Sequence, residues 1–440
     1  GSGGYACALR AAQLGKSVAL IERDKLGGTC LHYGCIPTKA LLHAAEVADE
    51  ARSGPEVGVR SSFDGIDMGA VNSYKDGVIA RLYKGLQGLV KSRKVTYVEG
   101  TGTLVAPNAV EVDGTSYEGT NVVLASGSYA RSLPGLAIDG QKVMTSYEAL
   151  RLDHVPDRVV VLGGGVIGVE FASVWRSFGS EVTVVEALPR LVPAEDEACS
   201  KAMERAFRKR KIAFKTGVRF SGVERTDAGV TVSLENGETI DADLLLVAVG
   251  RGPNTADMGY EQVGVTMDRG FVLTDERLRT NVPGVFAVGD IVPGLQLAHR
   301  GFQQGVFVAE EIAGLNPVPI DETAIPRVTY SEPEVASVGL TEAEAVERLG
   351  KDKVEALQYD LAGNGKSQIL KTAGFIKLVR EKDGPVLGIH MVGSRVGELI
   401  GEAQLIYSWE ALPSEVAQLV HAHPTQSEAM GEAHLALAGK

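Results

Sequence analysis

The segment "VVVLGGGVIGVEFASVWRSFGSEVTVVE", from Val159 to Glu186, is the strongest indication of the fold of this chain. It opens with a β-branched run, continues with glycines in the order G-x-G-x-x-G (Gly163, Gly165 and Gly168), and passes through a helical stretch into a second apolar strand that ends on an acid. The glycines allow a tight turn and a close backbone approach to a pyrophosphate, and the helix directs its N-terminus at the phosphates. Because the chain has 53 glycines in 440 residues, the glycine pattern alone is weak, and the strands and the final acid carry the specificity.

The same unit is repeated at the start of the chain. "GSGGYACALRAAQLGKSVALIE" places Gly1 and Gly4 where the second and third glycines of the pattern would stand, and it ends on Glu22. The third glycine precedes the acid by 18 residues in both copies, from Gly4 to Glu22 and from Gly168 to Glu186, which favours duplication over coincidence. The first strand and first glycine of this copy are absent from the sequence, and we expect roughly ten residues to precede Gly1.

Two copies of the unit imply two bound dinucleotides. An acid at the end of the second strand accepts hydrogen bonds from ribose hydroxyls, and this role is predicted for Glu22 and Glu186. The charge of Glu186 would also repel a 2′-phosphate, so the second unit should prefer NAD(H) to NADP(H). The simpler alternative for Glu186 is a solvated carboxylate at a strand end.

A second segment, "GGTCLHYGCIPTKALL" from Gly27 to Leu42, holds two of the four cysteines, five residues apart. The pair could be a structural disulfide, part of a metal site or a redox couple. Zinc is disfavoured because a structural site needs four ligands and no second pair at finger spacing is present. On a regular helix, residues five apart have Cα atoms roughly 8.5 Å apart, whereas a disulfide needs about 4.4 to 6.8 Å. The segment therefore cannot be one continuous helix if the cysteines are to form a disulfide.

The pattern after the pair predicts a helix. Gly34 provides a flexible joint, Pro37 suits a first helical turn, and residues 38–51 have helical character. Cys35 then lies beside the helix N-terminus, whose partial positive charge lowers the pKa of a thiol. We expect Cys35 to hold the negative charge, and Cys30, further out on a loop, to exchange with an external thiol.

Composition limits the class of protein. A chain of 440 residues with 44% hydrophobic residues can bury several cores, so two to four domains are expected. The net charge of -12 and the absence of a basic cluster longer than Arg208–Lys211 argue against nucleic acid or an anionic membrane as a partner. No run approaches the ~20 apolar residues of a membrane span. Four cysteines do not make a secreted framework, so a reducing compartment, the cytoplasm, is expected, with Cys7 and Cys199 as packing residues.

Taken together, the segments resemble the pyridine nucleotide-disulfide oxidoreductases over essentially the whole chain. Residues 27–42 are similar to the redox-disulfide signature of that family, and "NVVLASGSYARSLPG" (Asn121–Gly135) is similar to the strand and turn that close its flavin domain. "TNVPGVFAVGD" (Thr280–Asp290) resembles the second flavin motif, and "HAHPTQSE" (His421–Glu428) resembles the motif of the catalytic base. Within the family, the likeness is to enzymes that oxidise protein-bound dihydrolipoamide to lipoamide with NAD+.

The resemblance implies an α/β fold with two Rossmann-like dinucleotide-binding domains, one for FAD and one for NAD, and a C-terminal α+β dimerisation domain. The expected FAD-binding domain is 1–148 and the NAD-binding domain is 149–272. Residues 273–323 would complete the FAD domain, and 324–440 would form the interface domain of a homodimer.

The resemblance also assigns residues to each cofactor. Lys39 would lie near the flavin ring and pair with Glu170, although a surface lysine is the plain alternative. The expected FAD residues are Gly1, Gly4, Glu22, Lys39, Gly102, Ser126, Gly127, Ser128, Asp290, Gln296, Leu297, Ala298 and His299. The expected NAD residues are Gly163, Gly165, Val166, Ile167, Gly168, Glu170, Glu186, Val218 and Gly250.

The C-terminal motif supplies a candidate base. Pro424 takes the chain out of helix, so that His423 and Glu428 can form a hydrogen bond. A carboxylate on one ring nitrogen fixes the tautomer and makes the other nitrogen a base near neutral pH. By resemblance, His423 acts on the disulfide of the other subunit. His421 has no such partner in the motif and is predicted to be structural.

The predicted reaction is attack of dihydrolipoamide on the Cys30–Cys35 disulfide, followed by electron transfer through FAD to NAD+. The expected partners are a lipoyl-bearing E2 acyltransferase or the glycine cleavage H-protein. A reductase of another low-molecular-weight disulfide, a mercuric-type reductase and a non-enzymatic flavoprotein are the alternatives. His32 and Tyr33 depart from the commonest family residues, Asn and Val, as Ser126 does from Thr.

Overall fold

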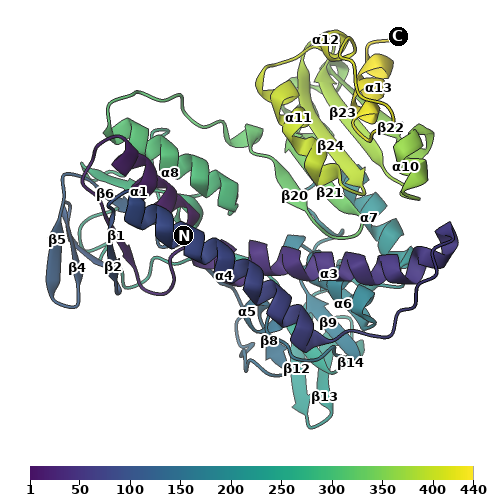
Figure 1. Cartoon of the computed structure of the whole chain (residues 1–440), viewed down its shortest axis with the longest axis horizontal. Helices are drawn as coiled ribbons and strands as arrows, with labels where there is room; N and C mark the ends of the chain where they lie inside the picture. Colours follow the sequence, from purple (N-terminus) through teal and green to yellow (C-terminus); the bar gives the residue numbers. More distant parts are fainter. Residues whose placement is uncertain (440) are drawn as a thin grey trace.

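The computed structural model describes residues 1–439 and has the predicted α/β architecture (Figure 1). In the first module, α1 (Ser2–Gln13) leads to β1 (Ala19–Glu22), which pairs in parallel with β2 (Thr96–Glu99). α8 (Ala298–Ile312), from much later in the chain, lies against α1. This approach requires a glycine, because a Cβ on Gly305 would lie 2.3 Å from the carbonyl oxygen of Gly3.

Short strands complete the first module. Parallel pairing joins β6 (Val122–Leu124) to β19 (Val285–Ala287), so that segments before and after the second unit build one body. The other strands are the antiparallel β3 (Thr103–Ala106), β4 (Ala109–Val112) and β5 (Thr115–Glu118), the pair β7 (Ser128–Ala130) and β16 (Arg251–Pro253), and the pair β17 (Met267–Asp268) and β18 (Phe271–Val272).

The second module is a five-stranded parallel sheet in the order β11-β10-β9-β15-β8. Its strands are β8 (Val143–Met144), β9 (Arg158–Leu162), β10 (Glu181–Glu186), β11 (Ala213–Thr216) and β15 (Leu244–Val247). The helices are α5 (Ser146–Ala149), α6 (Val166–Phe178) and α7 (Glu197–Lys209), and an antiparallel meander is formed by β12 (Phe220–Thr226), β13 (Gly229–Leu234) and β14 (Thr239–Ala242). The strand–helix–strand unit predicted for Val159–Glu186 is therefore confirmed.

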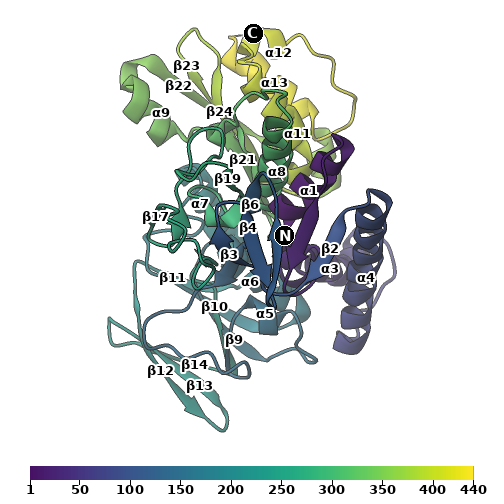
Figure 2. The same ribbon diagram turned by 90° about the vertical axis from the view of Figure 1, so that its left-hand side faces the viewer.

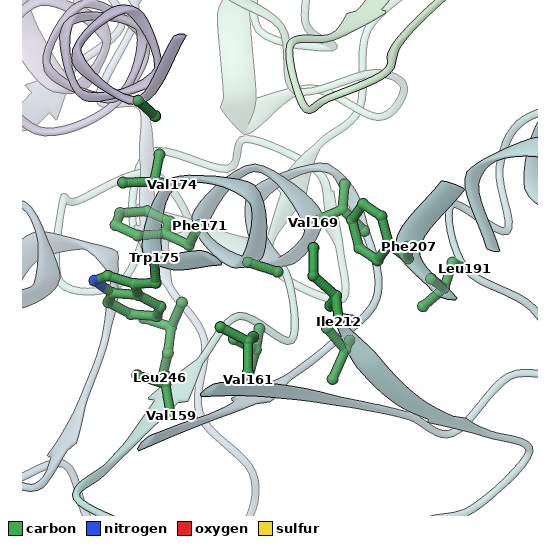
Figure 3. Packing of buried hydrophobic residues seen from close by; sticks show 14 of the residues in the cluster. Val159, Val161, Val169, Phe171, Val174, Trp175, Leu191, Phe207, Ile212 and Leu246 are labelled. Carbon is green, nitrogen blue, oxygen red and sulfur yellow. The ribbon is translucent and has the colours of Figure 1, made fainter. Parts of the chain in front are cut away.

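Figure 3 shows why this unit is stable. Phe171 and Trp175 of α6 lie above Val159 of β9, whereas Phe207 of α7 lies beside Val169 and above Ile212, all of them buried. Burying a valine or phenylalanine side chain contributes about 1.5 to 3 kcal/mol. The apolar residues of the quoted segment thus form the core of the second module.

The sheets divide the chain differently from the expected boundaries. β8 joins the second sheet although it precedes residue 149, and Met258, Tyr260 and Val265 pack in a cluster with Leu104 and Leu124 of the first module. We propose that the second module runs from β8 to β15 and that the chain returns to the first module at β16.

The C-terminal domain is an antiparallel sheet in the order β20-β21-β24-β23-β22, with helices packed against it. Ile376, Leu378, Ile389 and Met391 form its core together with Met430. The strands are β20 (Arg327–Thr329), β21 (Glu334–Gly339), β22 (Val354–Asp360), β23 (Phe375–Glu381) and β24 (Val386–Gly393). The helices are α9 (Glu342–Leu349), α10 (Gly365–Ile369), α11 (Val396–Ser408), α12 (Pro413–Val416) and α13 (Glu428–Leu437).

Two long helices, α3 (Cys35–Ser53) and α4 (Met68–Ser92), lie side by side in both views (Figures 1 and 2). α3 also packs on α6, so the helix that begins at Cys35 contacts the second module. Within residues 1–439, no helix has the length and apolar character that crossing a membrane requires.

Candidate active site

The cysteine pair lies at a break between two helices. Cys30 is on α2 (Gly28–Tyr33), and Cys35 is the first residue of α3. Gly34 separates them with φ -145° and ψ -105°, which interrupts the helix. The prediction that one continuous helix cannot span the pair is confirmed. The prediction that Cys30 lies on a loop is wrong, because residues 28–33 form a short helix of their own.

The glycines before α2 have a positional reason. Gly27 and Gly28 have φ values of 112° and 65°, in the left-handed region. A Cβ on Gly28 would also lie 2.5 Å from the Cα of Gly1. Only a glycine at position 28 allows the redox segment to pass this close to the start of α1.

The two thiols differ in acidity. Both cysteines are partly buried and carry free thiols. A hydrogen bond from the Cys30 thiol, with help from the Lys39 cation and against the effect of burial, lowers the pKa of Cys35 from 9.0 to about 7. The same hydrogen bond and burial raise the pKa of Cys30. The geometry thus makes Cys35 the thiolate and Cys30 the thiol.

Lys39 lies one turn after Cys35 and is paired with Glu170 of α6. Its Nζ is 2.8 Å from each carboxylate oxygen, and the Glu170 side chain is 3% exposed. Burial opposes the charge of Lys39, but Glu170, together with Cys35 and Tyr330, outweighs this effect and raises the Lys39 pKa. Tyr330, just after β20, donates its backbone N–H to Glu170 at 2.9 Å, and its ring lies 4.7 Å from the Lys39 Nζ.

Most of the residues expected to hold FAD gather around α1, β1 and the start of α8. The Glu22 carboxylate lies 3.5 Å from the Gly1 nitrogen, and Ser128 donates a hydrogen bond to Asp290. A Cβ on Gly4 would lie 3.3 Å from the Ala125 side chain, and one on Gly102 would lie 3.3 Å from Ile21 of β1. Ser126 accepts a hydrogen bond from Tyr260, Gly127 precedes β7, and Gln296 donates to the Asp290 carbonyl. Leu297 is the N-cap of α8, Ala298 is its first residue, and His299 bonds to the Pro326 carbonyl.

One buried amide supports a polar ligand here. Gln304 of α8 is fully buried, and its Oε1 accepts a hydrogen bond from the Gly289 N–H at 2.7 Å. Its Nε2 has no partner within residues 1–439. A buried amide that lacks a partner costs free energy unless a ligand or water supplies one. Donors and acceptors of this kind beside Asp290 fit a flavin nucleotide.

The glycine turn of the second module fits NAD. A Cβ on Gly168 would lie 1.8 Å from the Gly163 carbonyl oxygen, whereas one on Gly165 would meet open space. Gly168 lets the helix and the turn pack closely, and Gly165 leaves room for a pyrophosphate. Glu186 accepts hydrogen bonds from the N–H groups of Gly164 and Leu188, each at 2.7 Å. Val166 and Ile167 begin α6, Val218 bonds to the Glu186 carbonyl, and Gly250 lies just before β16 with a φ of 106°.

His423 and Glu428 form the predicted hydrogen bond, 2.8 Å from Nδ1 to Oε1. The imidazole is exposed at 77%, and Glu428 is the first residue of α13. The Thr425 N–H, followed by His423, lowers the pKa of Glu428. The carboxylate is therefore ionised and holds Nδ1, which leaves Nε2 free to accept a proton.

The structure does not bring His423 to the cysteines of its own chain. In both views α13 lies in the C-terminal domain, apart from the start of α3 (Figures 1 and 2). Sequence reasoning missed Tyr330, Gln304 and Glu402, which is the partner of His421. Tyr330 contacts Glu170 from 160 positions away in sequence, and Gln304 and Glu402 contact residues 15 and 19 positions away on other elements. No local pattern marks these contacts.

Two family models match this chain. The family described as "Pyridine nucleotide-disulphide oxidoreductase" matches residues 1–305, and the dimerisation domain of the same family matches residues 325–434. The chain therefore belongs to the pyridine nucleotide-disulphide oxidoreductase family, as its motifs predicted. FAD and NAD are the cofactors of this family, and the two cradles described above suit them.

Two individual relatives and one solved structure align with almost the whole of this chain. The chain is 40% identical over 460 residues to a dihydrolipoyl dehydrogenase of Bacillus subtilis, which covers 100% of this chain and 97% of the relative. It is also 40% identical to a leghemoglobin reductase of Glycine max, with 99% and 86% covered. The solved structure of LpdA from Mycobacterium tuberculosis superposes with a TM-score of 0.92 at 27% identity, covering 99% of this chain and 98% of that one.

Proposed function

We propose that this chain is a dihydrolipoyl dehydrogenase, which oxidises protein-bound dihydrolipoamide to lipoamide with NAD+ as the acceptor. The observation that carries the proposal is the asymmetric cysteine pair, in which Cys35 begins α3 with a pKa lowered to about 7 beside Lys39. A thiolate stabilised in this way is the leaving group that thiol–disulfide exchange requires.

The chain's own residues perform the thiol chemistry. His423 accepts a proton at Nε2 from one thiol of dihydrolipoamide, and the resulting thiolate attacks the Cys30 sulfur of the disulfide. The Cys30–Cys35 bond breaks, and Cys35 leaves as a thiolate. The second substrate thiol then loses its proton to solvent and attacks the substrate sulfur of the mixed disulfide, which closes the lipoamide ring. The protonated His423 returns its proton to the departing Cys30 sulfur, so that lipoamide departs and Cys30 is released as a thiol. Two electrons have then moved from the substrate to the cysteine pair.

Bound FAD would carry these electrons from the cysteine pair to NAD+. Asp290, Ser128 and the start of α8 would hold FAD, and Lys39 would lie beside its ring with its charge fixed by Glu170. Gly163, Gly165 and Gly168 would hold the NAD pyrophosphate. Glu186 would bind the ribose and disfavour NADP.

The match of residues 325–434 to the dimerisation domain of the family supports a homodimer. We propose that His423 serves the cysteine pair of the partner subunit, since its own lies apart from it. Exposed apolar side chains of the C-terminal domain, Trp409 at 75% and Val420 at 99%, support a surface that a second copy covers. The lipoyl donor would be an E2 acyltransferase or the glycine cleavage H-protein, and four cysteines in 440 residues suit a cytoplasmic location.

The test is a comparison of substrates on the FAD-loaded protein. NAD+-linked oxidation of dihydrolipoamide should exceed NADH- or NADPH-linked reduction of small disulfides such as glutathione disulfide. Faster reduction of a small disulfide than oxidation of dihydrolipoamide would instead assign the chain to the alternative reductase class.

A further inference from the structure

A second imidazole–carboxylate pair stands two residues before the proposed base. His421 Nε2 lies 2.7 Å from Oε1 of Glu402 on α11. The two residues are 19 positions apart in sequence, and their side chains are only 12% and 28% exposed. The prediction that His421 lacks a carboxylate partner is therefore wrong.

The His421 ring also contacts α13. A Cβ on Gly431 would lie 2.6 Å from the His421 Nδ1, so this position must be a glycine for the ring to pack there. Glu428, which bonds His423, begins the same helix. His434 follows on α13, where burial lowers its pKa to about 4 and keeps it neutral. His421 thus connects residues 418–424, the segment that carries the proposed base His423, to both α11 and α13.

Within one subunit, the rest of segment 418–424, which carries His423, makes few contacts. Between residues 418 and 424, every side chain except His421 is exposed. Leu419 and Val420 are exposed at 58% and 99%. The exposed His423 itself makes a single side-chain hydrogen bond, to Glu428, within the described part of the chain.

We propose that His421, held by Glu402, is a positioning residue that fixes the approach of the His423 imidazole to the substrate thiol. This inference rests on the proposed function, because it concerns the proton transfer that function requires. Proton transfer depends on geometry, and a displacement of about 1 Å can reduce a rate by as much as a hundredfold. An anchor two residues from an exposed base controls that geometry directly.

Substitution of His421 or Glu402 should affect one of two reactions of this protein and leave the other unchanged. Oxidation of dihydrolipoamide by NAD+ needs the base, whereas reduction of ferricyanide by NADH uses the flavin and the NAD site without it. His421→Ala and Glu402→Ala should each lower kcat for dihydrolipoamide about tenfold, while the ferricyanide rate and the KM for NAD+ stay near those of the unmodified protein. His421→Gln, which can still donate to Glu402, should recover most of the loss.

The matched control is His154→Ala in the second module. His154 is exposed and also bonds a carboxylate, Asp153, at 2.8 Å. The His154→Ala variant should leave the dihydrolipoamide and the ferricyanide rates unchanged.

Unchanged dihydrolipoamide kinetics in both alanine variants would overturn the inference, and so would an equal loss of both activities. If His421→Ala does not fold, Glu402→Ala alone decides. If the unmodified protein, loaded with FAD, does not oxidise dihydrolipoamide although it reduces ferricyanide, the proposed function fails.

Discussion

The Lys39 ammonium lies 2.8 Å from both carboxylate oxygens of Glu170, so an ion pair joins the redox helix to the second module. The two residues are 131 positions apart in sequence. The carboxylate is almost completely buried, and it keeps the lysine charged one turn from Cys35. The electrostatics of the cysteine pair therefore depend on packing between modules.

Lys39→Met should raise the pKa of Cys35, because the lysine cation helps to lower it. The thiolate absorbance of the reduced protein in the ultraviolet, followed against pH, measures this directly. The unmodified protein should titrate near pH 7 and the variant higher, toward the 9.0 of a free thiol. Identical titration curves would show that the lysine does not act on the thiolate.

Glu334 gives a pH dependence of stability. Burial, with help from neighbouring acids such as Glu332 and against the bond from the Gly397 N–H, raises its pKa from 4.5 to about 7. The folded state binds this proton more tightly than the unfolded state. The group therefore favours folding fully below pH 4.5, and this contribution is lost as pH rises through 7.

Glu334→Gln should remove the loss of stability that Glu334 causes as pH rises through 7. The variant should gain stability over the unmodified protein by about 1 to 2 kcal/mol at pH 8, because a neutral amide replaces a partly buried carboxylate and can still accept from the Gly397 N–H. Urea unfolding at pH 5 and pH 8 measures the difference. A gain of the same size at both pH values would contradict the assignment.

Glu186→Ala should relax the choice of cofactor. The carboxylate that would bind a ribose hydroxyl and repel a 2′-phosphate is then absent, so the KM for NAD+ should rise and the KM for NADP+ should fall. Because Glu186 also accepts two backbone N–H groups, a loss of stability of about 1 to 3 kcal/mol should accompany the change. An unchanged ratio of the two KM values would remove Glu186 from nucleotide recognition.

The two dinucleotide-binding units could be predicted from the sequence because their determinants are local. Gly163 and Gly168 must approach each other closely, and such contacts leave a fixed spacing in the chain. The break between the cysteines was predictable for a similar reason, since a bond distance cannot be met on one helix. The helix that contains Cys30 was not predicted, because six residues between two glycines give little periodic pattern.

Contacts between distant elements were beyond local reasoning. Tyr330 reaches Glu170 over 160 residues, and Glu402 reaches His421 only because α11 packs beside the base segment. The limit that we propose for the second module lies at β8, which is two residues long and carries no sequence pattern of its own. Such features follow from tertiary packing, which sets partners that neighbouring residues do not specify.

In the proposed reaction, Cys30 and Cys35 carry the electrons out of the substrate dithiol. The rate of NAD+-linked dihydrolipoamide oxidation by Cys30→Ser loaded with FAD tests this step, with Cys199→Ala, a buried cysteine of α7, as the control. We expect a loss of at least about a hundredfold in Cys30→Ser, with NADH:ferricyanide activity retained and the control unaffected. Undiminished dihydrolipoamide oxidation by Cys30→Ser would show that the cysteine pair does not carry the electrons.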